Sequence, residues 1–419
     1  MSGGWAAGPF GVDWEHRVDF EALRRGRLER ARAEMSAAGL DALLVWKDEN
    51  VRYLTSLRPQ LLAGKSGLLN GAMLVGDEAP ILFVSGGDHD RVRRGMPWLG
   101  EVCAIPILEE EGLVRHFAAA ILEPILRSRR LTRARVGLDL ASQTLHAALR
   151  AQWPEIHWAD GDGVMQRSRM IKLPEEVVLL EEAAAIADAV TQAAIDSVRP
   201  GVREVDVAGE ALRALHRLGG EYAHAVSPFV ASGERMSPPT RLATDKVIRY
   251  GDVVFIDIGA MFNGYFADVG RTVICGTPSA DQRRIFRAVY EAHVAGVAAL
   301  QPGATTRQVA DAVRRAAAAH GLAEHFLTLF IGHGIGVGSN EPPYIGEPFP
   351  GAAEVELRPG MVFALEPLIW LPGVRGGGGV RLEDTVLVTE RGPHVLSRAP
   401  YDSRLLGDGV SATRPTEGR

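Results

Sequence analysis

The chain has 419 residues, 46% of them hydrophobic, and a formal net charge of −6. This length and composition suffice for two domains with separate cores, and the lack of a dense Lys/Arg tract argues against a nucleic-acid partner. Two cysteines exclude a disulfide framework and a thiolate metal site. No stretch approaches 18 uninterrupted apolar residues, and the start of the chain lacks a signal-peptide pattern, so we expect a cytoplasmic protein with no membrane partner.

The first 164 residues predict an arm followed by an α/β domain. Residues 1–18 are Gly-rich and are expected to form an irregular arm. A helical apolar pattern follows and stops at Gly39, as helices often do. Short apolar runs that favour strands then alternate with helical patterns, which predicts an α/β domain over residues 19–164. These runs are residues 42–46, 72–75, 80–84, 102–107 and 135–138.

A basic segment that ends in a proline, residues 165–174, predicts the start of a second domain over residues 165–405, with a tail at 406–419. This domain contains a weak internal repeat at an offset of 102 residues, in which Pro200-Gly201 recurs as Pro302-Gly303. Each copy is a Pro-Gly turn, an amphipathic helix and a glycine stop, followed by strands. Chance similarity of Ala-rich helices is the competing explanation. Two similar α+β halves would give a pseudo-symmetric domain with a cleft between them.

The stretch from Gly251 to Gly276 predicts a β-hairpin that carries two aspartates. Asn263-Gly264, a strong hairpin signal, separates two runs rich in β-branched and apolar residues. If these two residues form the loop, paired residue numbers add to 527, so Asp257 faces Gly270 and Asp268 faces Gly259. The aspartates then share one face as diagonal neighbours, about 7–8 Å apart at Cα. The facing glycines are expected to leave the space above the pair empty.

Two bare buried carboxylates at this separation raise each other's pKa, whereas a shared cation stabilises both. The alternative is structural, with one aspartate capping a turn and the other pairing with Arg271. A second predicted hairpin, residues 361–370 and 380–389 around the loop LPGVRGGGG, carries Glu366 and Glu383 on its two strands. His333 lies between the hairpins in FIGHGIGVG, which lacks the spacing and the lysine of a phosphate-binding loop.

Two Asp, one His and two Glu suit two hard or borderline divalent ions better than a single zinc ion. Mn²⁺, Co²⁺, Fe²⁺ and Zn²⁺ all fit this set, and Mn²⁺ is the first expectation. Two ions about 3.5–4 Å apart can hold a bridging water, lower its pKa and polarise a carbonyl. The constellation is therefore typical of a metal-dependent amide hydrolase.

These motifs resemble the pita-bread metallopeptidases, which include methionine aminopeptidase, aminopeptidase P and prolidase, with creatinase as a metal-free relative. The resemblance rests on FIDIGAMFNGYFADVGRT, GHGIG, FALEP and VRLEDTVLVTE, in that order. The N-terminal α/β domain is similar to that of the creatinase/prolidase branch. The resemblance implies a creatinase-type α/β domain followed by a pseudo-symmetric α+β pita-bread catalytic domain. It also implies a homodimer.

The resemblance assigns a role to each ligand. Asp257 would chelate one ion, Asp268 and Glu383 would bridge both, and His333 and Glu366 would bind the other. The same resemblance makes Glu366 the catalytic residue that passes protons to and from the bridging water. Arg381 shares a strand face with Glu383 and would either orient that carboxylate or meet a substrate carboxylate.

Three positions depart from the family pattern. Thr240, Leu329 and Asn340 occupy places where prolidase-like members carry substrate-binding histidines. Thr240 and Asn340 can still donate hydrogen bonds to a substrate, whereas Leu329 cannot. His224, near the loop that precedes the first hairpin, is a candidate replacement, although a surface or core histidine is the simpler interpretation.

The sequence thus predicts a dinuclear metallohydrolase of the Xaa-Pro dipeptidase or aminopeptidase type that acts on a small peptide. The alternative is a metalloenzyme of the same fold that acts on a non-peptide metabolite, by amide hydrolysis or lyase chemistry. A non-catalytic scaffold is a third hypothesis, which requires that the chain bind no metal.

Overall fold

The computed structural model describes residues 18–59, 67–225, 227–236, 241–326, 331–346 and 353–407. The chain divides into two compact units, Met1–Arg169 and Met170–Arg419. Within the described ranges, no helix combines the length and the apolar character that crossing a bilayer requires.

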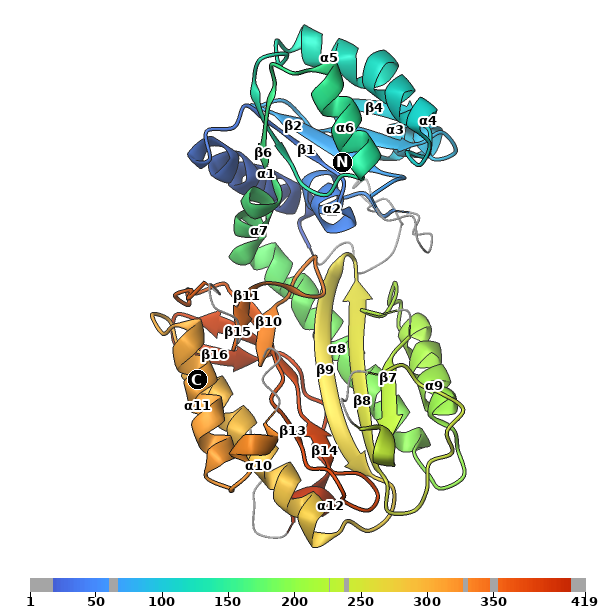
Figure 1. Cartoon of the computed structure of the whole chain (residues 1–419), viewed down its shortest axis with the longest axis vertical. Helices are drawn as coiled ribbons and strands as arrows, with labels where there is room; N and C mark the ends of the chain where they lie inside the picture. Colours follow the sequence, from blue (N-terminus) through green and yellow to red (C-terminus); the bar gives the residue numbers. More distant parts are fainter. Residues whose placement is uncertain are drawn as a thin grey trace, which may run out of the picture. The chain divides into compact units, whose positions relative to one another are not determined.

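The first unit is built on a mixed sheet whose strands, in the described part of the chain, lie in the order β4-β3-β2-β1-β5-β6 (Figure 1). The central strand β1 pairs antiparallel with β2 and parallel with β5. The final strand, β6, adds a sixth member that the sequence reading did not single out. The strands are β1 (Ala42–Val45), β2 (Gly71–Val75), β3 (Ile81–Ser85), β4 (Glu101–Ile105), β5 (Arg135–Leu138) and β6 (His157–Asp160).

The core of this unit lies between the sheet and the helices α4 to α6. Trp46 stacks on Phe83 with ring centroids 6.0 Å apart, and Phe117 meets both rings edge-on. These aromatic side chains are fully buried, so this unit has its own hydrophobic core. The helices are α1 (Phe20–Ala37), α2 (Asp48–Thr55), α3 (His89–Gly95), α4 (Glu111–His116), the π-helical turn η2 (Phe117–Leu122), α5 (Glu123–Ser128), α6 (Gln143–Gln152) and α7 (Asp162–Met170).

In the second unit, the long hairpin of β8 (Val253–Phe262) and β9 (Tyr265–Ile274) has the predicted register. Asp257 pairs with Gly270, and Gly259 pairs with Asp268. Asn263 and Gly264 have φ of 46° and 85°, the left-handed conformation that a two-residue hairpin turn requires. The short strand β7 (Phe229–Ser232) pairs with the outer edge of β8, and η3 (Gly233–Arg235) follows it.

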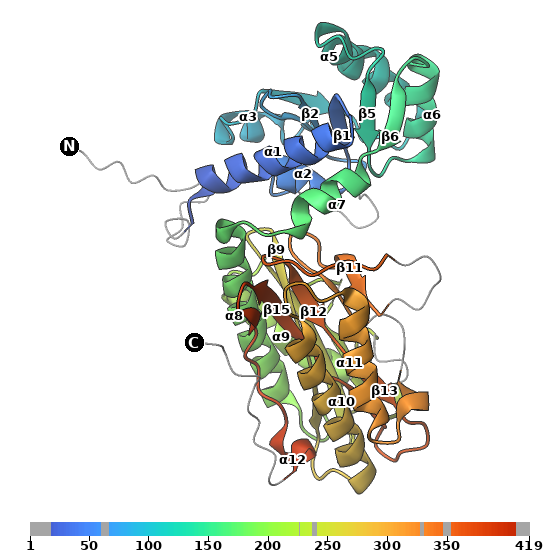
Figure 2. The same cartoon turned by 90° about the vertical axis from the view of Figure 1, so that its left-hand side faces the viewer.

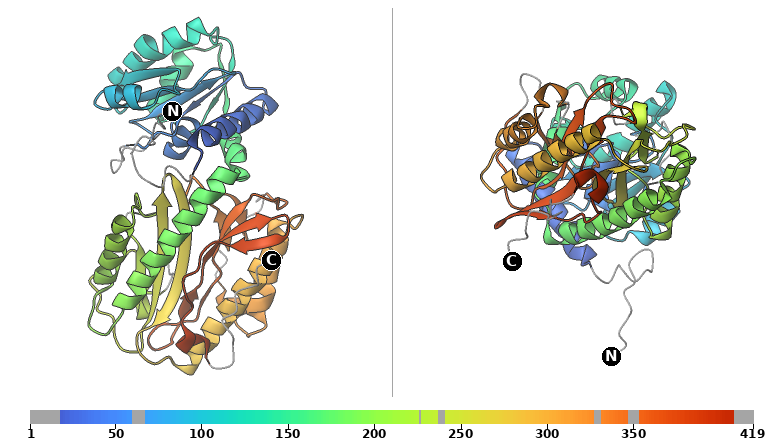
Figure 3. Two further views of the ribbon diagram at one scale, coloured as in Figure 1. Left: turned by 180° about the vertical axis from the view of Figure 1, so that it is seen from behind. Right: turned by 90° about the horizontal axis from the view of Figure 1, so that it is seen from below.

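The predicted internal repeat corresponds to two helix pairs. The pair α8 (Pro174–Ser197) and α9 (Glu204–Arg217) precedes the first hairpin, and α8 packs along it (Figure 3). The pair α10 (Ala280–Ala299) and α11 (Thr306–Ala318) lies side by side in the second half (Figure 2). The glycines that begin and end each copy share a positive φ, between 67° and 93°, at Gly201 and Gly303 and again at Gly219 and Gly321. The repeat therefore extends to backbone conformation.

The second predicted hairpin forms with one register but as two separate ladders. β12 (Val362–Leu365) pairs with β15 (Asp384–Thr389), and β13 (Leu368–Trp370) pairs with β14 (Gly379–Arg381). The ladder is interrupted where Glu366 and Glu383 lie. A described five-stranded sheet, in the order β11-β10-β12-β15-β16, contains the first of these ladders. The remaining elements are η4 (Ala323–His325), β10 (Gly332–Gly334), β11 (Glu341–Ile345), β16 (Gly392–Val395) and α12 (Ser403–Leu406).

Candidate metal centre

The structure brings the five predicted metal ligands together. Asp268, His333 and Glu383 each offer one ligand atom, and these atoms lie within 4.8 Å of one another. Asp268 also belongs to a second such group, which contains Asp257. Glu366 completes the set, because its Oε1 lies 3.3 Å from His333 Nε2. All five side chains are buried.

The two aspartates share one face of the first hairpin, as predicted, but the space opposite them is not empty. A Cβ built on Gly259 would lie 2.0 Å from Nδ1 of His224, and one built on Gly270 would lie 2.8 Å from Oε2 of Glu383. The prediction of an empty space was therefore wrong. Each facing glycine makes room for a ligand-type side chain from another part of the chain.

Glu366 and Glu383 reach the centre because the second hairpin opens beside them. Glu383 leaves the ladder of its own hairpin and pairs instead with Gly270 of the first. The backbone nitrogen of Glu383 donates to Gly270 O at 2.9 Å, and that of Gly270 donates to Glu383 O at 3.2 Å. Arg271 Nη1 also donates to Glu383 O at 2.6 Å. This bridge joins the two hairpins at the site itself.

His333 is held by its own strand. Its Nδ1 lies 3.0 Å from the carbonyl oxygen of Gly334, which can only accept, so Nδ1 carries the proton. The lone pair of the neutral ring is then on Nε2, the atom that points toward Glu366. Burial lowers the pKa of His333, which favours the neutral form that a metal ligand needs.

Arg381 lies among the ligand carboxylates. Its guanidinium is 3.0 Å from Glu383 Oε2 and 3.4 Å from Asp257 Oδ2, and it also contacts Glu366 Oε2. Burial disfavours its charge, but the attraction of Glu383, Asp257 and Asp268 outweighs this, and the pKa of Arg381 is raised. The predicted relation of Arg381 to Glu383 thus extends to two further carboxylates.

The electrostatics of the centre fit bound cations. Burial, reinforced by Asp257, raises the pKa of Asp268 well above its ordinary value, and burial likewise raises that of Glu383 to about 8. In the described part of the chain, one oxygen on each of four carboxylates is buried without a hydrogen-bond partner: Asp257 Oδ1, Asp268 Oδ1, Glu366 Oε1 and Glu383 Oε1. Unpaired buried carboxylate oxygens are costly in a protein interior, and divalent ions would compensate them.

His224 also lies beside the predicted ligands. From the sequence alone, a surface or core histidine was the simpler interpretation of this residue. Its Nδ1 lies 3.7 Å from Asp268 Oδ1, and its Nε2 lies 3.9 Å from Asp257 Oδ1. Neither motif spacing nor composition signals this position. The available signal was Gly259, whose missing side chain the register placed beside Asp257 and opposite Asp268.

Of the three positions that depart from the family pattern, one lies within the residues that the structure describes. Asn340 directly precedes β11 and is exposed to solvent. Thr240 and Leu329 lie outside the described residues.

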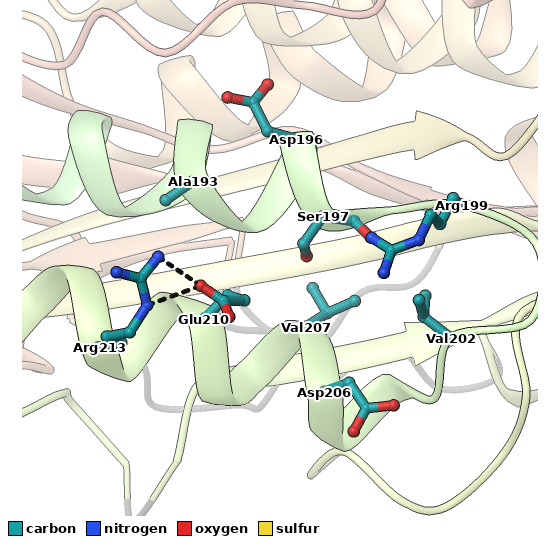
Figure 4. A pocket seen from close by; sticks show the side chains of 9 residues that line it. All are labelled: Ala193, Asp196, Ser197, Arg199, Val202, Asp206, Val207, Glu210 and Arg213. Atoms are coloured by element: carbon teal, nitrogen blue, oxygen red, sulfur yellow. Dashed lines mark hydrogen bonds and ion pairs between the residues drawn. The ribbon is translucent and has the colours of Figure 1, made fainter.

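A cavity of about 410 Å³ between α8 and α9 lies apart from the predicted ligands (Figure 4). Its lining is mainly charged and polar, and Arg213 on α9 pairs with Glu210 at 2.6 Å. None of the five predicted ligands lines it. We therefore place the candidate chemistry at the hairpins.

Comparison with known proteins assigns both units to the families that the sequence motifs resemble. Residues 178–390 match the model of metallopeptidase family M24, and residues 27–171 match the creatinase/prolidase N-terminal domain. The Bacillus subtilis protein named uncharacterized peptidase YqhT is 31% identical over 382 residues, 91% of this chain and 100% of its own length. The Xaa-Pro dipeptidase of Pyrococcus horikoshii is 30% identical over 367 residues, 87% of this chain and 94% of its own.

Solved structures agree with this assignment. The Xaa-Pro dipeptidase from Bacillus anthracis superposes with a TM-score of 0.76 at 26% identity, covering 90% of this chain and 99% of that one. The prolidase from Pyrococcus furiosus gives a TM-score of 0.72 at 28% identity, with 88% and 99% covered. The fold is thus the predicted creatinase-type domain followed by a pita-bread catalytic domain. The chain belongs to metallopeptidase family M24 and is a two-domain metallopeptidase of the creatinase/prolidase type.

Proposed function

We propose that this protein hydrolyses a peptide or amide bond of a small substrate with two divalent ions held by Asp257, Asp268, His333, Glu366 and Glu383. The observation that carries the proposal is the convergence of these five buried side chains, with an unpaired oxygen on each carboxylate. The occurrence of Asp268 in both ligand groups supports a bridging role for it. Mn²⁺ is the first ion to test, because four of the five ligands are carboxylates.

Bound ions would supply Lewis acidity and a water of lowered pKa. The protein residues would supply the proton transfers. Arg381 contacts Oε2 of Glu366 and holds that oxygen of the carboxylate. Its other oxygen, Oε1, is buried and has no hydrogen-bond partner among the described residues. We assign to Oε1 the uptake of a proton from the attacking water and its delivery to the leaving amine.

The relatives support the choice of substrate class, because several of them are named Xaa-Pro dipeptidases. We propose an Xaa-Pro dipeptide or a related small peptide, with Thr240 and Asn340 as substrate contacts and Arg381 as the group that orients the ligand carboxylates. The alternative is a non-peptide amide or a lyase substrate. It is favoured by Thr240, Leu329 and Asn340, which stand where prolidase-like members carry histidines. A homodimer remains the expected assembly.

The test is turnover by the purified protein loaded separately with Mn²⁺ and Co²⁺. The panel contains Xaa-Pro dipeptides, Xaa-non-Pro dipeptides and one tripeptide, which separates dipeptidase from aminopeptidase P activity. We expect Asp268→Ala to abolish turnover and Glu366→Gln to reduce kcat by about 10² or more. His216→Ala, at an exposed position on α9, is the matched control.

Two results would contradict the proposal. Full activity in Asp268→Ala would rule out the metal centre as the catalytic site. Two bound ions with no turnover of any peptide would move the substrate to the non-peptide class.

A further inference from the structure

A sixth ligand-type side chain, His224, faces the candidate metal centre from outside the two hairpins and the strand of His333. It forms a group with Asp257 and Asp268 in which one ligand atom from each residue lies within 4.8 Å of the others. Its ring nitrogens are 3.7 Å from Asp268 Oδ1 and 3.9 Å from Asp257 Oδ1.

The backbone fixes the position of His224. Residues 221–224 run antiparallel to the end of β8, on the edge that β7 also uses. In this short ladder His224 N donates to Gly259 O at 3.1 Å, and Glu221 N donates to Met261 O at 2.8 Å. The imidazole occupies the space that a side chain on Gly259 would fill, and its ring centroid lies 5.1 Å from that of Phe229 in an edge-to-face arrangement. The ring is thus held against the two aspartates.

The contacts of the ring do not fit a structural histidine. Its side chain is 12% exposed, and its buried Nδ1 has no hydrogen-bond partner within the described residues. The facing atoms, Asp257 Oδ1 and Asp268 Oδ1, are buried and unpartnered as well. A hydrogen bond between imidazole and carboxylate would bring the atoms to about 2.7–3.2 Å. The observed separations are longer than a hydrogen bond. One ligand atom from each of the three residues lies within 4.8 Å of the others, which fits donors that each lie about 2.0–2.2 Å from one shared ion.

We propose that His224 is a ligand of the ion held by Asp257 and Asp268. The inference rests on the metal centre of the proposed function and deepens it. Each of the two ions would then have one imidazole, from His224 at one and from His333 at the other. The centre would have six side-chain ligands.

A second imidazole changes which metal the centre prefers. Carboxylate oxygens suit Mn²⁺, whereas imidazole nitrogen favours Co²⁺ and Zn²⁺. His224 therefore shifts the relative affinity of the centre from Mn²⁺ toward Co²⁺. A merely structural histidine would not have this effect, because its loss would weaken the binding of all ions alike.

The experiment measures metal binding directly. Metal-free full-length protein is titrated with Co²⁺ and separately with Mn²⁺ against a competing chelator, and the visible absorption of bound Co²⁺ reports its ligands. The variants are His224→Ala, His224→Asp and the exposed-surface control His216→Ala. Circular dichroism checks that each variant is folded, and His224→Asp carries the test if His224→Ala does not fold.

We expect the wild type to bind two Co²⁺ ions per chain. His224→Ala should lower the affinity for one of them by about 100-fold, change its absorption, and weaken Mn²⁺ by a clearly smaller factor. His224→Asp should recover two-ion binding while its Co²⁺-to-Mn²⁺ affinity ratio falls below that of the wild type. The control should match the wild type in all respects.

Unchanged affinities and an unchanged Co²⁺ spectrum in His224→Ala would overturn the inference and leave the proposed function standing. Equal losses for Co²⁺ and Mn²⁺ without recovery in His224→Asp would also overturn it. A wild type that binds no divalent ion would overturn both the inference and the proposed function. A wild type that binds two ions yet cleaves no peptide would count against the peptide substrate alone, and the variants would still decide the role of His224.

Discussion

At the scale of single residues, the candidate site depends on two glycines as much as on its charged side chains. Gly259 and Gly270 lie opposite the two aspartates of the first hairpin, and each admits a side chain that approaches from another element. The atoms that a Cβ would meet are His224 at the first position and Glu383 at the second. Any larger residue at either position would displace a group that faces the aspartates.

Gly270→Ala tests this dependence. The added Cβ would lie 2.9 Å from Glu383 Cβ, at a position where the two backbones are also hydrogen-bonded, so the clash cannot be relieved by a side-chain rotation alone. We expect a loss of about 1–3 kcal/mol in the free energy of unfolding, together with weaker metal binding. Chemical denaturation and metal titration measure the two effects.

Gly209→Ala is the control for that substitution. Gly209 lies within α9, where a Cβ meets no atom within 4 Å, so the change should stabilise the protein by about 0.5–1 kcal/mol and leave metal binding unchanged. Equal effects of the two alanines would show that the space around Gly270 does not matter.

The sequence predicted which residues stand opposite each other here, because hairpin register follows from a two-residue turn. It did not predict what fills the space, because His224 and Glu383 reach these glycines through tertiary contacts. From the sequence, His224 was a candidate substrate contact, with a surface or core histidine as the simpler interpretation, and the space above the aspartates was expected to be empty.

At the scale of elements, the first hairpin depends on its turn. Asn263 and Gly264 both have positive φ, and each paired position along β8 and β9 follows from where that turn lies. A slip of one strand by one residue would turn its aspartate to the opposite face and separate the pair. The turn therefore sets the position of the two proposed metal ligands on this hairpin.

Gly264→Ala should strain the turn without touching the site. An L-residue at φ of 85° is disfavoured, so we expect a loss of about 1–2 kcal/mol in the free energy of unfolding, measured by urea denaturation. Asn263→Gly, which relieves the other left-handed position, should change stability by less than about 0.5 kcal/mol. A destabilisation by the second substitution as large as that by the first would contradict this account of the turn.

The second hairpin was predicted less completely than the first. Its strands and register are present, but the ladder is interrupted at Glu366 and Glu383, and the latter pairs with Gly270 instead. A pattern read along one strand pair cannot predict an interruption that a distant strand causes. The last strand of the first unit, β6, was missed for a different reason, since the residues of His157–Asp160 lack an apolar run.

At the scale of the whole molecule, one buried cluster joins the first hairpin of the catalytic unit to its second half. The cluster includes residues of β8 together with residues of α10, β12 and β15. His293 on α10 is buried in this region, with Nε2 at 3.3 Å from Asp384 Oδ2. Its titration consequently affects the stability of the unit.

The free energy of unfolding should fall as pH is lowered from about 6.5 to about 4. In this range His293 is charged in the unfolded chain but not in the native state. Burial lowers its pKa from 6.5 to about 4, so between these values the unfolded chain binds the extra proton and the native state does not. The contribution is fully present above pH 6.5 and is lost as pH falls toward 4. We expect the stability lost over this pH range to be at most about 3 kcal/mol. It is measured as the change with pH in the difference between the unfolding free energies of the wild type and His293→Gln.

The measurement is made in excess chelator, because metal binding depends on pH as well. The unfolding free energy of the wild type minus that of His293→Gln should fall as pH is lowered from 7 toward 4. A difference that is constant across this range would show that His293 does not titrate as its burial implies.

The backbone bridge between Gly270 and Glu383 also has a consequence for biosynthesis. A growing chain that has left the ribosome only as far as α10 contains Asp257 and Asp268 but lacks His333, Glu366 and Glu383. The two aspartates then lack the other three residues of the proposed ligand set. If these residues hold the ions as proposed, metal insertion follows translation of both halves, and a nascent chain stalled at the end of β12, which lacks Glu366 and Glu383, would not retain the ions.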